Sequence, residues 1–177
     1  MGSWTYDERD ADLLVLTGVE GPASRLGHAL TLRWTRWRAV VEHADGMPST
    51  VHVRVAADGL EVVHGEGGLK GLSRVEKAMV RRRALKELGA ADHPEIAFVA
   101  EVERARDGWL LRGTLRVRGR SRAYAVHVRE ADGRLSVDEP VRQTDFGVRP
   151  VRFLGGAFSV ADEVRLRLAG VASPDAG

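Results

Sequence analysis

A glycine-rich stretch at residues 64–71, HGEGGLKG, is one segment whose residues could do chemistry. Its glycines would let backbone amides come close to an anion, and Lys70 stands beside them. The order GxxxxGK[ST] of nucleotide-binding loops is absent, however. We therefore expect a strand that loosens into a turn before the next helix, and not a phosphate site.

A second segment, at residues 145–147, contains the Asp-Phe-Gly triplet of protein kinases. The other kinase motifs, a GxGxxG loop and a His-Arg-Asp loop, are missing from the chain. We expect a structural role for the triplet instead. Phe146 would plug the fold, and Gly147 would permit a backbone bend that a Cβ atom would obstruct.

Other candidate catalytic and metal-binding groups form no recognisable set. The chain has no cysteine, no HExxH pattern and no serine in a GxSxG pattern. The carboxylates of Glu101, Glu103, Asp162 and Glu163 fall on expected strands, but their spacing identifies no converging pair. We expect the six histidines to be structural or surface residues: His28, His43, His52, His64, His93 and His127. The sequence thus predicts no metal, no cofactor and a protein that is not an enzyme.

The charge composition gives little support to a polyanionic partner. The chain has 27 Lys and Arg against 25 Asp and Glu, a net charge of +2. Its pI of about 9.4 follows from arginine, because few groups titrate between neutrality and the range of arginine. Five arginines, at 112, 116, 118, 120 and 122, form the best nucleic-acid candidate, but no aromatic side chains accompany them on their face. We expect a solvated face there and not a nucleic-acid partner.

The start of the chain shows no targeting segment. Its first twelve residues, MGSWTYDERDAD, are polar and acidic and lack the basic and apolar regions of a secretion signal. No run approaches the roughly 18 apolar residues that a membrane-spanning helix needs. We expect a cytoplasmic protein with frayed tails at residues 1–10 and 171–177 and one domain at residues 11–170.

The elements that would position any site are mostly β-strands. Four Asp-Gly pairs, which favour tight hairpin turns, start at residues 45, 58, 107 and 132, and runs that alternate apolar and polar residues flank them. The alternation predicts strands at residues 12–17, 28–35, 36–43, 49–57, 60–66, 95–105, 108–118, 122–130, 134–142 and 161–169.

One segment, residues 73–88, predicts an amphipathic helix. Ser73 and Glu76 have the spacing of a capping box, and Gly89 offers a left-handed C-cap. The expected apolar stripe consists of Val75, Ala78, Met79, Leu85 and Leu88. It would cover an open end of a sheet or barrel; a basic surface helix that binds a membrane or nucleic acid is the alternative.

Strands in meander order with one inserted helix suit an antiparallel barrel or a two-sheet sandwich. Several runs are long, and about eight such strands close a tube that side chains can fill or that can hold one small ligand. We therefore expect an all-β fold, an extended antiparallel β-barrel with one amphipathic helix inserted near residues 73–89. The residues leave open whether its interior is a filled core or a ligand cavity.

Four segments resemble a known family. They are HPEIAF at 93–98, LRGTLRVRGRSR at 111–122, QTDFGV at 143–148 and VADEV at 160–164. In this order they resemble the yPei.F strand, the G.Lt.rG.tr hairpin, the R.DFGi segment and the closing v.deV.i strand of the YceI-like family of lipocalin-like lipid-binding barrels. The resemblance covers roughly residues 60–170. It implies an extended barrel with helical cover that holds an amphiphile such as a polyisoprenoid chain, without general catalytic residues.

The chain also differs from many members of that family. It opens with LLVLTG at 13–18 where they have a secretion signal and an Asp-x-x-His-Ser-x-x-x-Phe strand, and it carries Gln143-Thr144 where Arg-Ser is usual. In this it resembles a signal-less cytoplasmic branch.

The expected site has two parts. Inward-facing cavity residues would be Leu32, Trp34, Phe98, Leu111, Leu115, Val117, Tyr124, Val126, Phe146 and Leu166. At the mouth, Lys70 and Arg74 would meet an anionic headgroup while Val75 and Met79 line the entrance. The expected partner is an apolar or amphiphilic small molecule, a polyisoprenoid or lipid, with transient membrane contact and a homodimer as further partners to test. The alternative function is a filled barrel that acts as an interaction or nucleic-acid-binding module through the helix at 73–88. A third, weaker alternative is an enzyme with a buried acid or histidine at the floor of the cavity.

Overall fold

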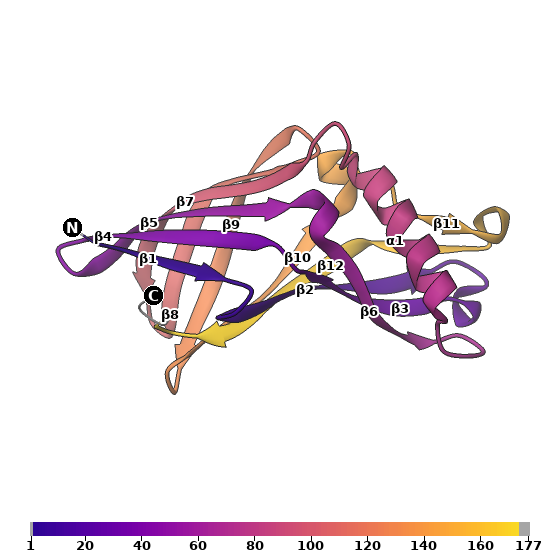
Figure 1. The fold of residues 1–177 in the computed structure, drawn as a ribbon, viewed down its shortest axis with the longest axis horizontal. Coiled ribbons are helices and arrows are strands. Elements are labelled where there is room, and N and C mark those ends of the chain that lie inside the picture. Colours follow the sequence, from indigo (N-terminus) through magenta and orange to yellow (C-terminus); the bar gives the residue numbers. More distant parts are fainter. Residues whose placement is uncertain (1, 174–177) are drawn as a thin grey trace.

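A computed structural model describes residues 2–173 as one curled antiparallel sheet with a single α-helix against it (Figure 1). The strands are β1 (Gly2–Asp7), β2 (Ala11–Glu20), β3 (His28–Trp34), β4 (Trp37–Ala44), β5 (Met47–Ala56), β6 (Leu60–Gly67), β7 (Glu95–Ala105), β8 (Gly108–Val117), β9 (Arg120–Ala131), β10 (Arg134–Arg142), β11 (Arg152–Phe153) and β12 (Phe158–Val171). The helix is α1 (Arg74–Leu88). This architecture confirms the predicted all-β barrel with one inserted helix.

All ten predicted strands are present, and two more were not predicted. One is the short β11, and the other is β1, which pairs with β4 from Gly2 opposite His43 to Asp7 opposite Arg38. The predicted tail at residues 1–10 is therefore wrong over residues 2–7, because Trp4 and Tyr6 alternate with polar neighbours and face inward. The predicted tail at 171–177 begins at the last residue of β12, and residues 174–177 lie outside the described residues.

Three of the four Asp-Gly pairs make hairpin turns, between β4 and β5, β7 and β8, and β9 and β10. At the first and third, both turn residues have positive φ, as at Asp132 (50°) and Gly133 (70°). The pair at Asp58 lies instead in a short 3₁₀ turn, Ala57–Gly59, which joins β5 to β6 without reversing the chain into a hairpin. Turn chemistry therefore helps to set the register of three strand pairs, β4–β5, β7–β8 and β9–β10.

The chain itself brings the two ends of the sheet together. Hydrogen-bonded neighbours follow the order β1-β4-β5-β7-β8-β9-β10-β12-β2-β3-β6, so β3 and β4 lie near opposite ends of the path. Only Thr35 and Arg36 separate these two strands in sequence. Across this corner, the Thr35 N–H donates to Gly59 O at 2.9 Å and the Ala56 N–H donates to Arg36 O at 3.0 Å. Two long bent strands, β3–β4 and β5–β6, thus curl the sheet into a barrel.

The helix begins and ends as predicted. The Glu76 N–H donates to Ser73 Oγ at 3.2 Å, the Ser73 N–H donates to Glu76 Oε2 at 2.8 Å, and Gly89 is left-handed with φ of 64°. The predicted apolar stripe is only partly right. Val75 is 79% exposed and Met79 is also exposed, whereas Val80, Ala84, Leu85 and Leu88 pack against the core. The helix does not separate an apolar from a polar face, because Lys77 and Arg81 also point toward the sheet.

Candidate functional site

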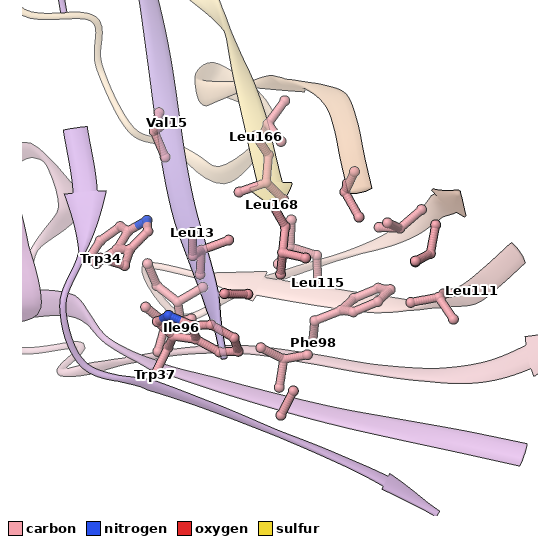
Figure 2. Close-up of a pocket in the computed structure, with 18 of the residues that line it drawn as sticks. Leu13, Val15, Trp34, Trp37, Ile96, Phe98, Leu111, Leu115, Leu166 and Leu168 are labelled. Atoms are coloured by element: carbon pink, nitrogen blue, oxygen red, sulfur yellow. The ribbon is translucent and has the colours of Figure 1, made fainter. Parts of the chain in front are cut away.

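The interior of the barrel contains an elongated cavity of about 580 Å³. Inward-facing side chains of most of the strands and of α1 line it. Figure 2 shows Phe98, Leu111 and Leu115 on one wall, Leu13, Leu166 and Leu168 on another, and Trp34 and Trp37 beside Ile96. The volume falls within the roughly 300–1,000 Å³ of small-molecule sites. The apolar residues that the alternation assigned to a core are therefore the walls of a ligand-sized space.

All ten side chains predicted for the interior lie along this cavity. Strand parity explains this for all of them except Phe146, since residues two apart on a strand share a face. Phe98 on β7 lies opposite Leu115 on β8 in register, and its ring meets that of Tyr124 edge-on with centroids 6.2 Å apart. Phe146, in the short 3₁₀ turn before Gly147, is 4% exposed and closes the wall near α1.

Polar groups in the wall mostly hydrogen-bond within the protein. Tyr6 donates to Ala172 O at 2.7 Å, Tyr124 donates to Pro140 O at 3.0 Å, and Gln143 Nε2 donates to Ala161 O at 2.9 Å. Burial raises the pKa of Tyr6 and of Tyr124 to about 12, which marks a poorly solvated interior. Two buried side-chain nitrogens of the described wall have no partner, Trp37 Nε1 and His43 Nδ1. The wall therefore offers few polar contacts to a molecule inside.

The cavity opens at the end of the barrel that lies away from α1. Its exposed lining residues are Trp4, Gly46, Met47, Arg104, Glu130, Val171 and Ser173. They lie on β1, on the turns and ends of β4–β5, β7–β8 and β9–β10, and at the end of β12, which gather at one end of the molecule (Figure 1). We call this end the mouth.

A belt of polar and aromatic side chains surrounds the mouth. His43, Arg104 and Glu130 end the inward-facing rows of β4, β7 and β9. The Trp109 indole donates to Glu130 Oε2 at 2.9 Å, and the Arg104 guanidinium lies 4.4 Å from the Trp109 ring centroid and 3.8 Å from the same carboxylate oxygen. Trp4 packs on His43 with ring centroids 4.6 Å apart. The apolar tube thus ends in groups that can face water.

α1 forms part of the side wall. Its Val80, Ala84 and Leu88 line the cavity, and cationic side chains fix the helix to β6, which is an edge strand. Lys77 Nζ donates to Val63 O at 2.6 Å, and Arg81 Nε donates to Leu60 O at 2.7 Å. These bonds cover part of the open edge that β6 would otherwise present.

The opposite side of α1 is held to the segment around β11. Arg83 donates to Arg152 O at 3.1 Å and stacks over Phe153, 5.3 Å from the ring centroid. Arg149 lies 4.0 Å from Glu87. The helix therefore connects β6 with the segment around β11, and it forms part of the barrel wall.

The predicted mouth is in the wrong place. Lys70, Arg74, Val75 and Met79 do not line the cavity: Lys70 is exposed in the loop before α1, and the other three are exposed on the helix. Lys70 instead lies 3.9 Å from Glu76, the capping residue. The prediction assumed that flexible glycines beside cations would mark the opening. The segment at 64–71 instead contains the end of β6 and the loop that leads to α1.

Sequence reasoning also missed the belt. Its signal was present in the parity of the strands: the inward row 96, 98, 100, 102 on β7 continues to Arg104, and the inward row of β9 continues to Glu130. Within residues 2–173, no group of three or more His, Asp or Glu side chains is arranged to hold a metal ion. The described helix is too short and too polar to span a membrane.

Comparison with solved structures identifies the architecture. BcnA of Burkholderia cenocepacia superposes with a TM-score of 0.65 over 92% of this chain and 96% of its own, at 14% identity. The YceI protein of Campylobacter jejuni superposes with a TM-score of 0.54 over 81% of this chain and 84% of its own, at 12% identity, and a mutant form of it gives 0.56 over the same shares. The chain has the fold of the YceI proteins.

This YceI fold confirms the resemblance of the four segments as far as architecture is concerned. No protein-family model matches the sequence, and no curated protein matches it. The YceI fold is therefore recognisable here through the arrangement of the strands, which survives at an identity of 12–14%.

Proposed function

We propose that the protein binds and carries one apolar or amphiphilic molecule with an isoprenoid-like or fatty chain inside its barrel. The observation that supports this most is the elongated apolar cavity of about 580 Å³ in a barrel whose wall polar groups are largely satisfied internally. A filled barrel that serves only as an interaction module would not keep such a space. The YceI fold, a barrel of binding type, agrees with the proposal.

The chemistry of the wall decides which part of a ligand would contribute most of the affinity. Each methylene transferred from water to the cavity contributes roughly 0.8 kcal/mol, so a chain of several carbons suffices for tight binding. Exposed charge contacts contribute only about 0–1 kcal/mol. We therefore expect chain length to matter more than the charge of the headgroup.

The mouth determines the orientation of such a ligand. A chain would lie between Phe98, Leu115 and Leu166, and a polar end would lie near His43, Arg104 and Glu130. The proposed cavity residues are the ten predicted from the sequence, whereas the proposed contacts of the polar end replace Lys70, Arg74, Val75 and Met79.

The direct test is organic extraction of natively purified protein followed by mass spectrometry. We expect one class of long-chain compound at near-stoichiometric amount, together with displacement of an environment-sensitive fluorescent probe by that compound. Protein that contains no extractable compound and that binds no long-chain probe would contradict the proposal.

A matched pair of variants connects binding to the cavity. Val126→Trp adds a large ring to the wall, whereas Val99→Trp adds the same ring to the outer face of β7, where Val99 is exposed. We expect Val126→Trp to lose probe binding at least tenfold and Val99→Trp to bind like the parent. Thermal unfolding of both variants controls for loss of structure.

A further inference from the structure

The end of the barrel opposite the mouth concentrates positive charge. It consists of three segments, residues 20–27, 67–83 and 149–158, which we call the basic end. These segments carry nine Lys and Arg and two Glu, a net charge of +7. Because the whole chain has a net charge of +2, all other residues together carry −5. The protein is therefore strongly polarised although its total charge is small.

The three segments contact one another in the fold. The Ala23 N–H donates to Ala157 O at 3.0 Å, and Arg83 donates to Arg152 O at 3.1 Å. His28, the residue directly after the first segment, has its Nε2 atom 2.6 Å from Lys70 O. Figure 1 shows their loops at the same end of the molecule, next to the N-terminal half of α1. The charges thus lie on one continuous surface.

Several cations of the basic end are not used by the fold. The side chains of Arg25, Arg74, Arg82 and Arg152 are exposed, and among the described residues none of them makes an ion pair or a side-chain hydrogen bond. This contrasts with most arginines of the sheet, such as Arg165, which is 2.7 Å from Asp138. A surface of unpaired guanidinium groups is suited to an anionic partner.

Exposed aliphatic side chains accompany these cations. Leu69 is 88% exposed and Leu154 is 70% exposed, each in a loop of the basic end, and Leu26 is exposed in the third loop. Val75 and Met79 lie four residues apart on the outer side of α1 and are also exposed. Large aliphatic groups at loop tips cost free energy in water, so their clustering indicates a surface that meets an apolar phase.

Unpaired cations together with exposed aliphatic side chains favour a lipid surface over a nucleic acid or a second copy of the chain. Binding of single-stranded nucleic acid relies on exposed aromatic side chains on which bases stack, but Phe153 and Phe158 stack on each other, with centroids 5.2 Å apart, and are half-buried. A second copy of the chain would place two surfaces of +7 against each other. An anionic bilayer accepts both the arginines at its headgroups and the leucines below them.

We infer that the basic end docks on the surface of an anionic lipid bilayer, with Leu69 and Leu154 inserted at the headgroup level and Arg74 and Arg82 against the phosphates. The mouth then faces away from the bilayer, and α1 lies between the bilayer and the cavity. Docking does not depend on a ligand in the cavity, so it goes beyond the function proposed above.

The test is co-sedimentation of the full chain with vesicles of phosphatidylcholine alone and with vesicles that also contain phosphatidylglycerol. We expect binding only to the anionic vesicles, weakened by high salt. Arg74→Gln with Arg82→Gln should weaken binding roughly 30-fold, about fivefold for each removed cation. Leu69→Ser with Leu154→Ser should weaken it at least tenfold while the salt dependence remains.

Matched controls come from the mouth. Arg106→Gln with Arg134→Gln removes two exposed arginines there, and Met47→Ser removes an exposed apolar side chain. Neither control should change vesicle binding. All the substituted side chains are exposed, and unfolding curves check that each variant folds.

Three results would overturn the inference. One is a parent protein that does not bind anionic vesicles. Another is a loss of vesicle binding in the mouth controls that equals the loss in the variants of the basic end. The third is binding of a short single-stranded oligonucleotide with salt dependence and sensitivity to the Arg74 and Arg82 changes, in the absence of vesicle binding. Extraction of a cavity ligand is measured separately, so its outcome does not decide this test.

Discussion

Arg81 of α1 donates a hydrogen bond from its Nε atom to the backbone carbonyl of Leu60, 2.7 Å away on the edge strand β6. Its terminal nitrogen donates to Asp58 O at 2.6 Å, and one helical turn earlier Lys77 reaches Val63 O. Two of these cationic hydrogen bonds end on β6, and the third ends on the turn before it. Among residues 2–173, no strand pairs with the outer edge of β6. The helix contains no fully buried side chain, so these bonds carry much of its attachment.

This attachment leads to a first prediction. Lys77→Met with Arg81→Met should lower the free energy of local opening of α1 by about 1–3 kcal/mol, because hydrogen bonds from charged groups are lost while the side-chain stems remain. Hydrogen exchange over residues 74–88 should accelerate, and exchange in β8 and β9 should not. Arg82→Met, in which an exposed and unpaired arginine is changed, is the control. Equal acceleration in the control would contradict the anchoring role.

A second prediction distinguishes the two ends of the barrel. Met47→Phe enlarges an exposed side chain at the mouth and should slow both association and dissociation of a long-chain fluorescent probe several-fold in stopped-flow measurements. Val75→Phe makes a similar change at an exposed position of α1 that does not line the cavity. It should leave both rates unchanged. If only the Val75 variant exchanged the probe more slowly, the cavity would open near α1 and not at the mouth.

A third prediction concerns the backbone after the Asp-Phe pair. Gly147 has φ of 70°, and a Cβ atom there would lie 2.7 Å from Arg120 Cζ; Gly133 has the same φ with no atom within 4 Å. Gly133→Ala should therefore cost about 1–2 kcal/mol, the strain of a left-handed residue alone. Gly147→Ala should cost only slightly more, since the exposed end of the flexible Arg120 side chain must also move.

Urea unfolding curves measure both losses. Replacing Arg120 by Ala should bring the loss at Gly147 close to that at Gly133. If Gly147→Ala and Gly133→Ala lower the free energy of unfolding equally with Arg120 in place, the contact with Arg120 does not contribute to the loss of stability. Gly147→Val, with a β-branched side chain, should prevent folding.

A fourth prediction follows from the two tyrosines. Their pKa is raised to about 12 by burial, whereas an exposed tyrosine ionises near pH 10. The folded state thus holds the phenolic protons more tightly. The resulting stabilisation is complete below about pH 10 and is lost as the pH rises through 12.

Absorbance titration checks this directly, because the chain has only two tyrosines. At about pH 11 the folded protein should show little tyrosinate and the urea-unfolded protein mostly tyrosinate. Tyr6→Phe with Tyr124→Phe should flatten the decline of stability above about pH 10. A tyrosinate signal that is the same in folded and unfolded protein would exclude the burial of these groups.

Much of the fold could be predicted from the sequence, because alternation and helix capping are local patterns with direct structural causes. Alternation located ten strands because each has one face toward the interior, and nine of the ten predicted cavity residues, all but Phe146, lie along the cavity because strand parity decides which face that is. The capping box and the glycine C-cap located α1 to within a residue because they satisfy backbone groups locally.

Other features depend on contacts that no local pattern contains. β1 has too few apolar residues for its sequence to predict a strand, and it forms by pairing with β4, which is distant in sequence. The side of α1 that faces the barrel is set by the carbonyls of β6, which take Lys77 and Arg81, and this turns Val75 outward. The position of the mouth follows from which ends of the strands remain uncovered, and only the assembled sheet determines that.

The ladder between β2 and β12 has a consequence for the way the protein is made. β2 is synthesised well before its neighbour β12, although Ala11 lies opposite Gly170 in the sheet. The seam cannot form before β12 has been made, and joining segments so distant in sequence carries a large loop-closure entropy. A nascent chain would expose its apolar inner face until β12 has left the ribosome and paired, so the speed of this step determines how long the newly made protein can aggregate.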